Sequence, residues 1–165
     1  MQNNVRSEML IGKEKMDILK ISRVAVFGVG GVGGYVVEAL ARIGIGTIAL
    51  IDNDKVSESN INRQIIALKS TVGMYKTEVM KTRILDINEN ANVETFNMFY
   101  LPENADSINL QNYDYIVDAV DTVSAKVELA VRAEALGIPI ISIMGTGNKL
   151  DATAFKVTDI YKTSG

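Results

Sequence analysis

Apolar and polar residues follow one another along this chain in blocks that predict strands alternating with helices. Short apolar runs indicate strands at residues 24–27, 47–51, 92–99, 115–119 and 138–143, and we expect the last to be buried on both sides. Apolar residues spaced three and four apart indicate helices at residues 6–21, 31–43, 74–88 and 124–136. This alternation predicts an α/β fold that is Rossmann-like and doubly wound, with a mainly parallel sheet and helices on both faces.

The remaining stretches are expected to connect these elements. Residues 55–71 are polar and irregular, residues 101–112 contain a short helix after Pro102, residues 145–149 form a glycine-containing loop, and residues 153–160 form a further strand. The length of 165 residues is that of a single domain, which we assign to 1–165. Because the last five residues supply neither a helix cap nor a returning strand, we expect this domain to be truncated or incompletely resolved at its C-terminus.

Composition narrows the class of protein. The net charge is −3 and no long block of like charge occurs, which is not typical of a dedicated nucleic-acid binder. No apolar run reaches the roughly 18 residues of a membrane span, and the N-terminus lacks the apolar core of a signal peptide. We therefore expect a cytoplasmic protein without a membrane partner.

Two residue types are absent from the sequence. Without cysteine there is no thiolate nucleophile and no cysteine-ligated zinc, and without histidine the commonest general base is missing. Chemistry in this chain must therefore depend on carboxylates, lysine, arginine, backbone N–H groups and a bound metal ion.

A glycine-rich turn joins the first predicted strand to the following helix. Gly28, Gly30 and Gly33 match the pattern G-x-G-x-x-G, and Gly31 and Gly34 extend it. In this pattern the first glycine makes a tight turn, the second lets the backbone approach a phosphate, and the third lets the helix pack against the strand. The helix N-terminus then offers N–H groups to an anion. Nucleotide binding is the favoured interpretation, and tight packing without a ligand is the alternative.

An acid and two cations follow this turn. Asp52 ends the second predicted strand, where a carboxylate accepts hydrogen bonds from ribose hydroxyls, although this does not distinguish ATP from NAD. Arg63 and Lys76 can stabilise charge that develops on a transferring phosphate, which a redox dinucleotide site needs less. If only one of these two side chains were present, a solvated surface charge would be the simpler interpretation. The same polar segment also presents Asp54, Asn60 and Gln64 as candidate cofactor-binding residues.

Asp118 and Asp121 follow the fourth predicted strand, at the edge of the sheet where ligands bind in such folds. In a chain without histidine and cysteine, an aspartate that acts together with phosphate oxygens is the simplest ligand set for Mg²⁺. Asp121 is the candidate metal ligand. Its alternative role is to cap the helix that starts near residue 124.

Taken together, these motifs resemble the adenylating domain of the ubiquitin-activating and thiamine-biosynthesis type of adenylyltransferases. The resemblance rests on G-V-G-G-V-G-G, D-N-D, S-N-I-N-R-Q, G-M-Y-K and D-A-V-D-T, which span nearly the whole chain. Four further stretches resemble one branch of that family, the tRNA threonylcarbamoyladenosine dehydratases. They are R-S-E-M-L, A-V-D-T-V-S-A-K, I-S-I-M-G-T-G-N-K-L-D-A-T and D-I-Y-K-T-S. The resemblance implies ATP and Mg²⁺ as cofactors, a homodimer, and tRNA as the substrate.

The resemblance also implies roles for individual residues. Gly30 and Gly31 would lie near the phosphates, and Asp52 would hold the ribose. Arg6 matches an arginine that such dimers insert into the partner's nucleotide site. The triphosphate would be bound by Asn60, Arg63 and Lys76, and Mg²⁺ would be placed by Asp121. The absence of cysteine departs from the members that transfer sulfur through thiols.

These observations predict an ATP-dependent enzyme that adenylates a carboxylate, with cyclising dehydration of threonylcarbamoyladenosine in tRNA as the reaction. Three alternatives stay open at this point. The first is an adenylyltransferase that activates the C-terminus of a ubiquitin-like sulfur-carrier protein. The second is an NAD-dependent oxidoreductase, and the third is a scaffold that binds a ubiquitin-like protein without catalysis.

Overall fold

A parallel β-sheet forms the centre of the molecule. The computed structural model describes residues 4–147 and 150–163. Five strands pair in the order β3-β2-β1-β4-β5, and each neighbouring pair is parallel. Their bounds are β1 Arg23–Phe27, β2 Thr47–Ile51, β3 Asn92–Phe96, β4 Tyr115–Asp118 and β5 Ile140–Ser142. The strand order reverses between β1 and β4, and ligands bind beyond the carboxyl ends of the strands at such a point.

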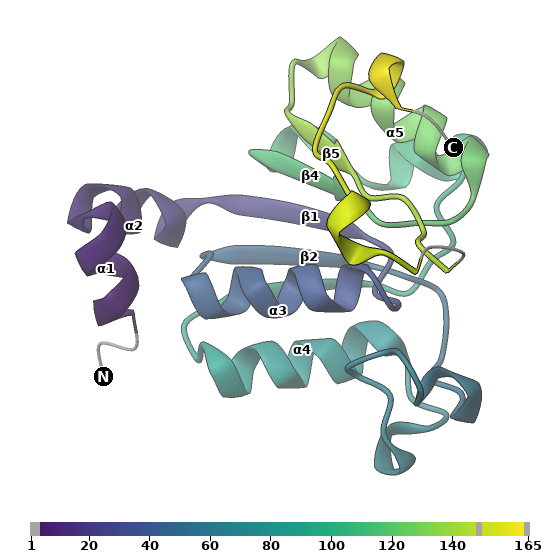
Figure 1. Cartoon of the computed structure of the whole chain (residues 1–165), viewed down its shortest axis with the longest axis horizontal. Helices are drawn as coiled ribbons and strands as arrows, with labels where there is room; N and C mark the ends of the chain where they lie inside the picture. The colour runs from purple at the N-terminus through teal and green to yellow at the C-terminus, as the bar shows by residue number, and fades with distance from the viewer. Residues whose placement is uncertain (1–3, 148–149, 164–165) are drawn as a thin grey trace.

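Helices cover both faces of this sheet, as predicted (Figure 1). Helices α3 (Gly33–Ile43) and α4 (Lys76–Ile87) cover one face, and α5 (Val123–Leu136) covers the other together with 3₁₀ turns at Pro102–Ser107 and Leu110–Asn112. Successive residues of a strand point to opposite faces. Val24 and Val26 accordingly join the apolar core under α3 and α4, while Ala25 and Phe27 join the core under α5. None of the described helices is long and apolar enough to cross a membrane.

The predicted continuous helix over residues 6–21 is wrong. The structure has two helices there, α1 (Val5–Ile11) and α2 (Lys13–Ile21), which are separated at Gly12. Gly12 has a φ of 86°, a conformation that ends a right-handed helix and that glycine adopts without steric cost. The two helices therefore form a hairpin at the amino ends of the strands (Figure 1).

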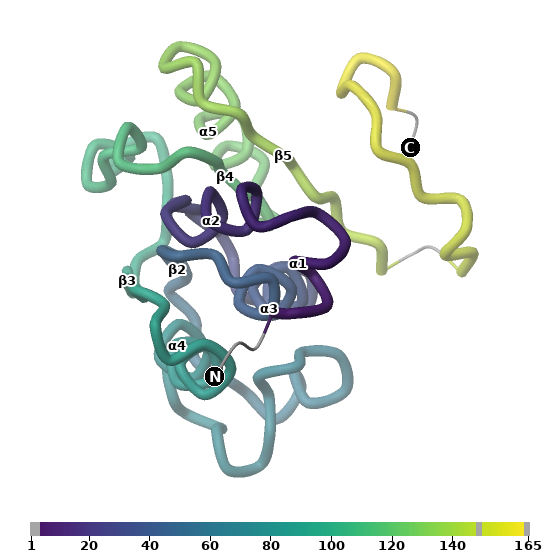
Figure 2. The backbone as a smooth tube through the Cα atoms, turned by 90° about the vertical axis from the view of Figure 1, so that its left-hand side faces the viewer, coloured from purple at the N-terminus to yellow at the C-terminus, as the bar shows by residue number. Residues whose placement is uncertain are grey.

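The end of the chain also differs from the prediction. Strand β5 is short and only half-buried, because no described strand pairs with its outer edge and Ser142 is exposed. The predicted strand at 153–160 is replaced by exposed 3₁₀ turns at Ala152–Ala154 and Ile160–Lys162, and each turn is capped by an aspartate side chain. This segment lies away from the layered part of the fold (Figure 2). Within the loop expected at 145–149, residues 148–149 lie outside the described residues.

Candidate nucleotide-binding site

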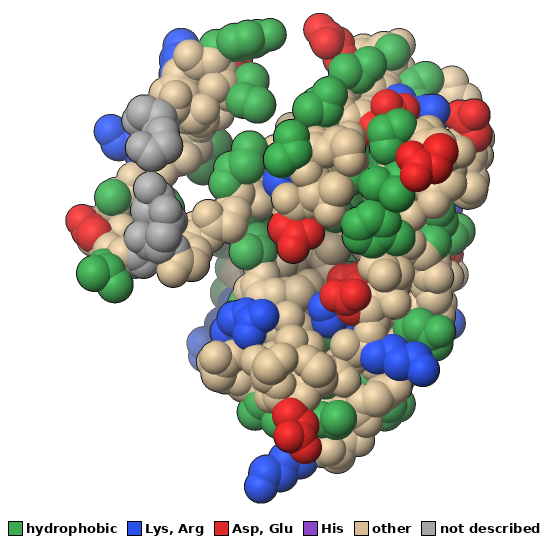
Figure 3. Space-filling view, turned by 90° about the vertical axis from the view of Figure 1, so that its right-hand side faces the viewer, with side chains coloured by type: hydrophobic (Ala, Val, Ile, Leu, Met, Phe, Trp, Pro, Cys, Tyr) green, Lys and Arg blue, Asp and Glu red, His purple; other side chains and the backbone are tan. Residues whose placement is uncertain are grey.

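A cavity of about 910 Å³ opens at the carboxyl ends of the strands. Acidic and basic side chains are interspersed around a hollow on this face (Figure 3). Ten of the predicted site residues line the cavity: Gly28, Gly30, Gly31, Asp52, Asp54, Asn60, Arg63, Gln64, Lys76 and Asp121. Two predicted residues, Gly33 and Arg6, do not line it. The fold therefore brings together residues that lie far apart in the sequence.

The glycine turn is closely packed at two of its positions. Gly28 has a φ of 88°, and a Cβ atom there would lie 2.6 Å from the carbonyl oxygen of Ala119. A Cβ atom on Gly33 would lie 1.8 Å from the carbonyl oxygen of Gly28, so only glycine lets α3 approach β1 this closely. At Gly30 and Gly31, by contrast, the nearest atoms would be 3.7 Å away, on the side chains of residues 63 and 64. The turn thus leaves room beside the backbone that faces the cavity.

Asp52 fixes the backbone of two segments, the glycine turn and the loop that follows β2. Its Oδ2 accepts a hydrogen bond of 2.7 Å from the Val29 N–H in the glycine turn, and its Oδ1 accepts one of 2.8 Å from the Asp54 N–H. A carboxylate has about four lone-pair positions, so two accepted bonds leave capacity for a ribose hydroxyl. Sequence reasoning suggested the ribose contact but missed this structural role.

Lys76 is a buried cation at the start of α4. Its side chain is only 6% exposed, and Nζ lies 2.6 Å from Oδ2 of Asp54, whose side chain is 57% exposed. The Lys76 N–H also donates to the Asp54 carbonyl oxygen at 3.0 Å. An ammonium group has three N–H donors, and Asp54 is its one hydrogen-bond partner among the described residues. Lys76 therefore keeps donors that can contact a phosphate.

Arg63 lies on the exposed rim of the cavity, near Gly31. Its Nη1 donates to the Ser59 carbonyl oxygen at 2.9 Å and to Asn62 Oδ1 at 3.0 Å. These contacts hold the guanidinium within its own loop and leave its other N–H groups available to an anion.

Two buried amides lie in the same loop. Asn60 accepts a hydrogen bond of 3.1 Å from the Ser57 N–H and shapes the 3₁₀ turn Glu58–Asn60. Gln64 is 7% exposed, and its Oε1 atom has no hydrogen-bond partner among the described residues. Buried polar atoms in proteins are nearly always hydrogen-bonded, so an unpartnered amide on a cavity wall fits a site that binds a polar ligand.

Asp121 is exposed and lines the cavity just before α5. It does not cap this helix: the N-cap residue is Thr122, without a side-chain cap hydrogen bond. Among the described residues, the Asp121 carboxylate accepts one hydrogen bond, from the Thr122 hydroxyl to Oδ1 at 3.5 Å. The N-cap alternative is therefore wrong. No group of three or more metal-ligating side chains occurs in the described ranges. Asp121 alone fits Mg²⁺ because that ion commonly binds one or two carboxylates together with substrate phosphates.

The wall formed by residues 98–100 is mainly apolar. Tyr100 is buried and packs edge-to-face against Phe27, with the ring centroids 4.8 Å apart. Burial raises the pKa of Tyr100 to about 12, so its phenol stays neutral at physiological pH. An apolar wall beside a polar turn suits a ligand that has both a flat base and phosphates.

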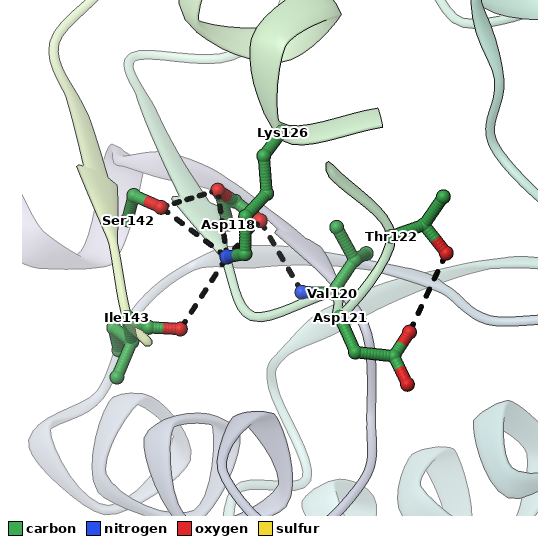
Figure 4. Close-up of polar contacts among 7 residues, drawn as sticks. All are labelled: Asp118, Val120, Asp121, Thr122, Lys126, Ser142 and Ile143. Atoms are coloured by element: carbon green, nitrogen blue, oxygen red, sulfur yellow. Dashed lines mark hydrogen bonds and ion pairs between the residues drawn. The ribbon is translucent and has the colours of Figure 1, made fainter. Parts of the chain in front are cut away.

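Sequence reasoning missed a cluster of three side chains at the ends of β4 and β5, which we call the Lys126 cluster: Lys126, Asp118 and Ser142 (Figure 4). Lys126 Nζ lies 3.2 and 3.1 Å from the two carboxylate oxygens of Asp118, which is 1% exposed. Ser142 Oγ donates to Asp118 Oδ2 at 2.5 Å. The signal in the sequence was Ser142, a polar residue that interrupts an apolar run.

Arg6 lies exposed on α1. Helix α1 lies at the amino ends of the strands, whereas the cavity opens at their carboxyl ends (Figure 1). Arg6 therefore does not reach the cavity of its own chain.

Comparisons with known proteins place the chain in a family. Residues 2–164 match the model of the ThiF family. A tRNA threonylcarbamoyladenosine dehydratase of Bacillus subtilis is 48% identical over 158 residues, which cover 96% of this chain and 62% of that protein. An adenylyltransferase and sulfurtransferase of Vanderwaltozyma polyspora is 40% identical over 131 residues, which cover 79% of this chain and 30% of that protein.

Solved structures show the same relationship. The crystal structure of the Escherichia coli tRNA N6-threonylcarbamoyladenosine dehydratase in complex with ATP matches with a TM-score of 0.92 and 39% identity, and the match covers 98% of this chain and 67% of that one. The chain spans about three fifths of the length of the bacterial dehydratases that it matches.

Proposed function

The chain belongs to the ThiF family, and on this premise we propose that the protein uses ATP to convert a carboxylate into its acyl-adenylate. A carboxylate oxygen attacks the α-phosphorus of ATP, the bond from that phosphorus to the bridging oxygen breaks, and pyrophosphate leaves. The observation that carries the proposal is the position of Lys76, which is buried, retains free N–H donors and lines the same cavity as the glycine turn.

In this proposal the protein positions the reactants and offsets charge, without forming a covalent bond to the substrate. The glycine turn, Arg63 and Lys76 donate hydrogen bonds to phosphate oxygens, where negative charge grows as pyrophosphate departs. Asp121 would hold Mg²⁺ together with phosphate oxygens, and that ion would neutralise part of their charge. Asn60 shapes the loop that carries Arg63, and the unpartnered Gln64 amide on the cavity wall would contact the nucleotide.

For the acceptor we propose the threonyl carboxylate of threonylcarbamoyladenosine in tRNA. The dehydratases among the relatives support this choice, and the absence of cysteine argues against sulfur transfer through a thiol of this chain. Once the carboxylate is adenylated, the carbamoyl group of the same base attacks the acyl carbon, AMP leaves, and a ring closes. The nucleoside loses the elements of water, so its mass falls by about 18 Da after intramolecular attack on the activated acyl group.

ATP–pyrophosphate exchange by the full-length protein tests both parts of the proposal. We expect exchange to depend on tRNA that carries threonylcarbamoyladenosine, and not on unmodified tRNA or on a panel of ubiquitin-like carrier proteins. Mass spectrometry of the same tRNA should show the cyclic nucleoside. Exchange that requires a carrier protein would overturn the acceptor but keep adenylation, whereas no exchange with any acceptor would overturn adenylation itself.

A second candidate is adenylation of the C-terminal carboxylate of a ubiquitin-like sulfur carrier. The identity of 40% to an adenylyltransferase and sulfurtransferase favours it. The carrier arm of the exchange experiment decides between the two acceptors, because both use the same chemistry at ATP.

We further propose that the protein is a cytoplasmic, two-fold homodimer in which Arg6 completes the nucleotide site of the partner subunit. Its exposed position far from its own cavity supports a role in trans, and two-fold dimers are the commonest oligomers. Mixing Arg6→Ala protein with Lys76→Ala protein should then restore activity, because one site in each heterodimer keeps both residues. If heterodimers form and activity does not recover, Arg6 does not act in trans.

A further inference from the structure

The ammonium group of Lys126 has no donor left for a ligand. Four oxygen atoms lie within 3.5 Å of Nζ: both carboxylate oxygens of Asp118, the hydroxyl of Ser142 at 3.3 Å and the carbonyl of Ile143 at 3.5 Å. An ammonium group donates three N–H bonds, so these acceptors use its full capacity. Although Lys126 lines the cavity, it is therefore not equipped to bind a phosphate.

The same cluster holds the loop that carries Asp121. Asp118 Oδ1 accepts a hydrogen bond of 3.2 Å from the Val120 N–H. On the other side of this loop, the Ala119 N–H donates to the Phe27 carbonyl oxygen at 2.8 Å, and the Ala119 carbonyl lies against Gly28. Residues 119–122 are thus held between the Lys126 cluster and the glycine turn, and Figure 4 shows the Asp121 side chain pointing away from the cluster.

Three elements meet at the cluster. Asp118 ends β4, Lys126 comes from the first turns of α5, and Ser142 ends the short edge strand β5. Since Asp118 is 1% exposed, its negative charge is tolerated only because Lys126 and Ser142 compensate for it. The geometry of the loop consequently depends on a cation and a hydroxyl that lie outside the loop itself.

We propose that Lys126, with Asp118 and Ser142, is a positioning unit that sets where Asp121 lies relative to the glycine turn. The unit touches neither ATP nor the acceptor and acts through the Val120 N–H. This inference rests on the proposed function, in which Asp121 places Mg²⁺ on the phosphates. Groups that orient metal-binding residues without touching the metal typically change metal affinity or activity by about 10–100-fold when they are removed.

The first test measures the Mg²⁺ concentration that gives half-maximal ATP–pyrophosphate exchange in the full-length protein. We expect Lys126→Met to raise it about tenfold and to lower kcat, with a smaller change in the KM for ATP, and Lys126→Arg to recover part of the loss. The control is Arg83→Met, which removes an ion pair with Glu38 between α3 and α4, away from the cavity. A folded Lys126→Met protein with the Mg²⁺ dependence of the wild type would overturn the proposal.

The second test does not depend on catalysis. Hydrogen exchange of the Val120 amide, followed by NMR, should be at least about tenfold faster in Lys126→Met and Ser142→Ala than in the wild type, and unchanged in Arg83→Met. If Lys126→Met does not fold, Ser142→Ala carries both tests, because it removes one hydroxyl from an exposed residue. Unchanged Val120 exchange in Ser142→Ala would then overturn the unit.

The two tests separate this proposal from the proposed function. If the wild type shows no pyrophosphate exchange but the Val120 amide responds as expected, the adenylation proposal fails and the structural unit stands. If exchange occurs normally and neither readout responds in the variants, adenylation stands and the positioning unit fails.

Discussion

Lys76 and Lys126 carry the same ammonium group on the wall of one cavity, but their surroundings differ. Each lies near the start of a helix, lines the same cavity and is paired with an aspartate. The partner of Lys76 is the exposed Asp54, which water can solvate, and Lys76 has one described acceptor. The partner of Lys126 is fully buried, and four acceptors surround the ammonium group.

This difference shows that a charged side chain on a cavity wall need not bind the ligand. The number of unsatisfied donors and the burial of the partner indicate its role: Lys76 can exchange a contact for a phosphate, whereas moving Lys126 would strand a buried carboxylate. We therefore expect mutations of Lys76 to affect catalysis more than folding, and mutations of Lys126 to affect folding and loop position together.

The largest effect should be on stability. Lys126→Met leaves the buried Asp118 carboxylate uncompensated, and we expect unfolding free energy to fall by about 3–5 kcal/mol. Urea unfolding measures this change. The matched variant Arg83→Met breaks a pair whose arginine is 37% exposed, and should cost no more than about 1 kcal/mol. If both variants lose the same unfolding free energy, Lys126 contributes no more to stability than an ordinary surface ion pair does.

For Lys76→Ala we expect ATP–pyrophosphate exchange to fall by about 100-fold or more, because one preorganised charge contact in the transition state is lost. Its unfolding free energy should fall less than that of Lys126→Met, since Asp54 remains hydrated when its partner is lost. Arg63→Ala should lose exchange on the same scale. The control is Lys69→Ala, which changes an exposed lysine that does not line the cavity. Exchange like that of the wild type in Lys76→Ala would place this lysine outside the catalytic site.

Stabilisation by a bound nucleotide tests the role of Lys76 independently of catalysis. ATP with Mg²⁺ at about 100 times its Kd should stabilise the wild type by roughly 2.7 kcal/mol, while NAD should not. The shift should largely disappear in Lys76→Ala at the same ATP concentration. Thermal unfolding with each nucleotide measures it. Equal or larger stabilisation by NAD would contradict the adenylation proposal and favour an oxidoreductase.

The smallest effect concerns a pair that lies outside the site. The hydrogen bond from Arg83 holds the pKa of Glu38 below its usual value. A lowered folded-state pKa contributes stability above the unfolded pKa, about 4.3 for glutamate, and that stability is lost as the pH falls through the folded pKa. In Glu38→Gln the unfolding free energy should therefore fall less between neutral and acidic pH than it does in the wild type. Denaturant unfolding at several pH values can check this.

Much of this fold follows from local sequence patterns. The buried strands and the glycine turn depend on neighbouring residues, so β1, β2 and β4 and the close approach at Gly33 were predictable. The break at Gly12 was not, because a single glycine is tolerated within a helical pattern and only its φ of 86° ends the helix. The half-burial of β5 depends on the absence of a described strand beside it, which no local pattern reports.

The site also contains residues that the sequence predicted and residues that it did not. Residues that we propose to contact a nucleotide lie in contiguous motifs, and the fold brings Arg63 and Lys76 to the predicted cavity. The Lys126 cluster joins residues 118, 126 and 142, whose contact exists only once α5 has packed against β4 and β5. In the sequence this contact leaves only a local trace, the polar Ser142 within an apolar run, and nothing there names its partners.

The glycine turn has a consequence for the thermodynamics of binding. Its backbone is already held by the Gly28 N–H, which donates to the Ile51 carbonyl at 2.8 Å, and by the Val29 N–H on Asp52. A loop that is ordered before the ligand arrives loses little conformational entropy on binding, so more of the interaction energy appears as affinity. Nucleotide recognition in this region should therefore be close to rigid docking, with the entropic cost confined to side chains such as Arg63 on the rim.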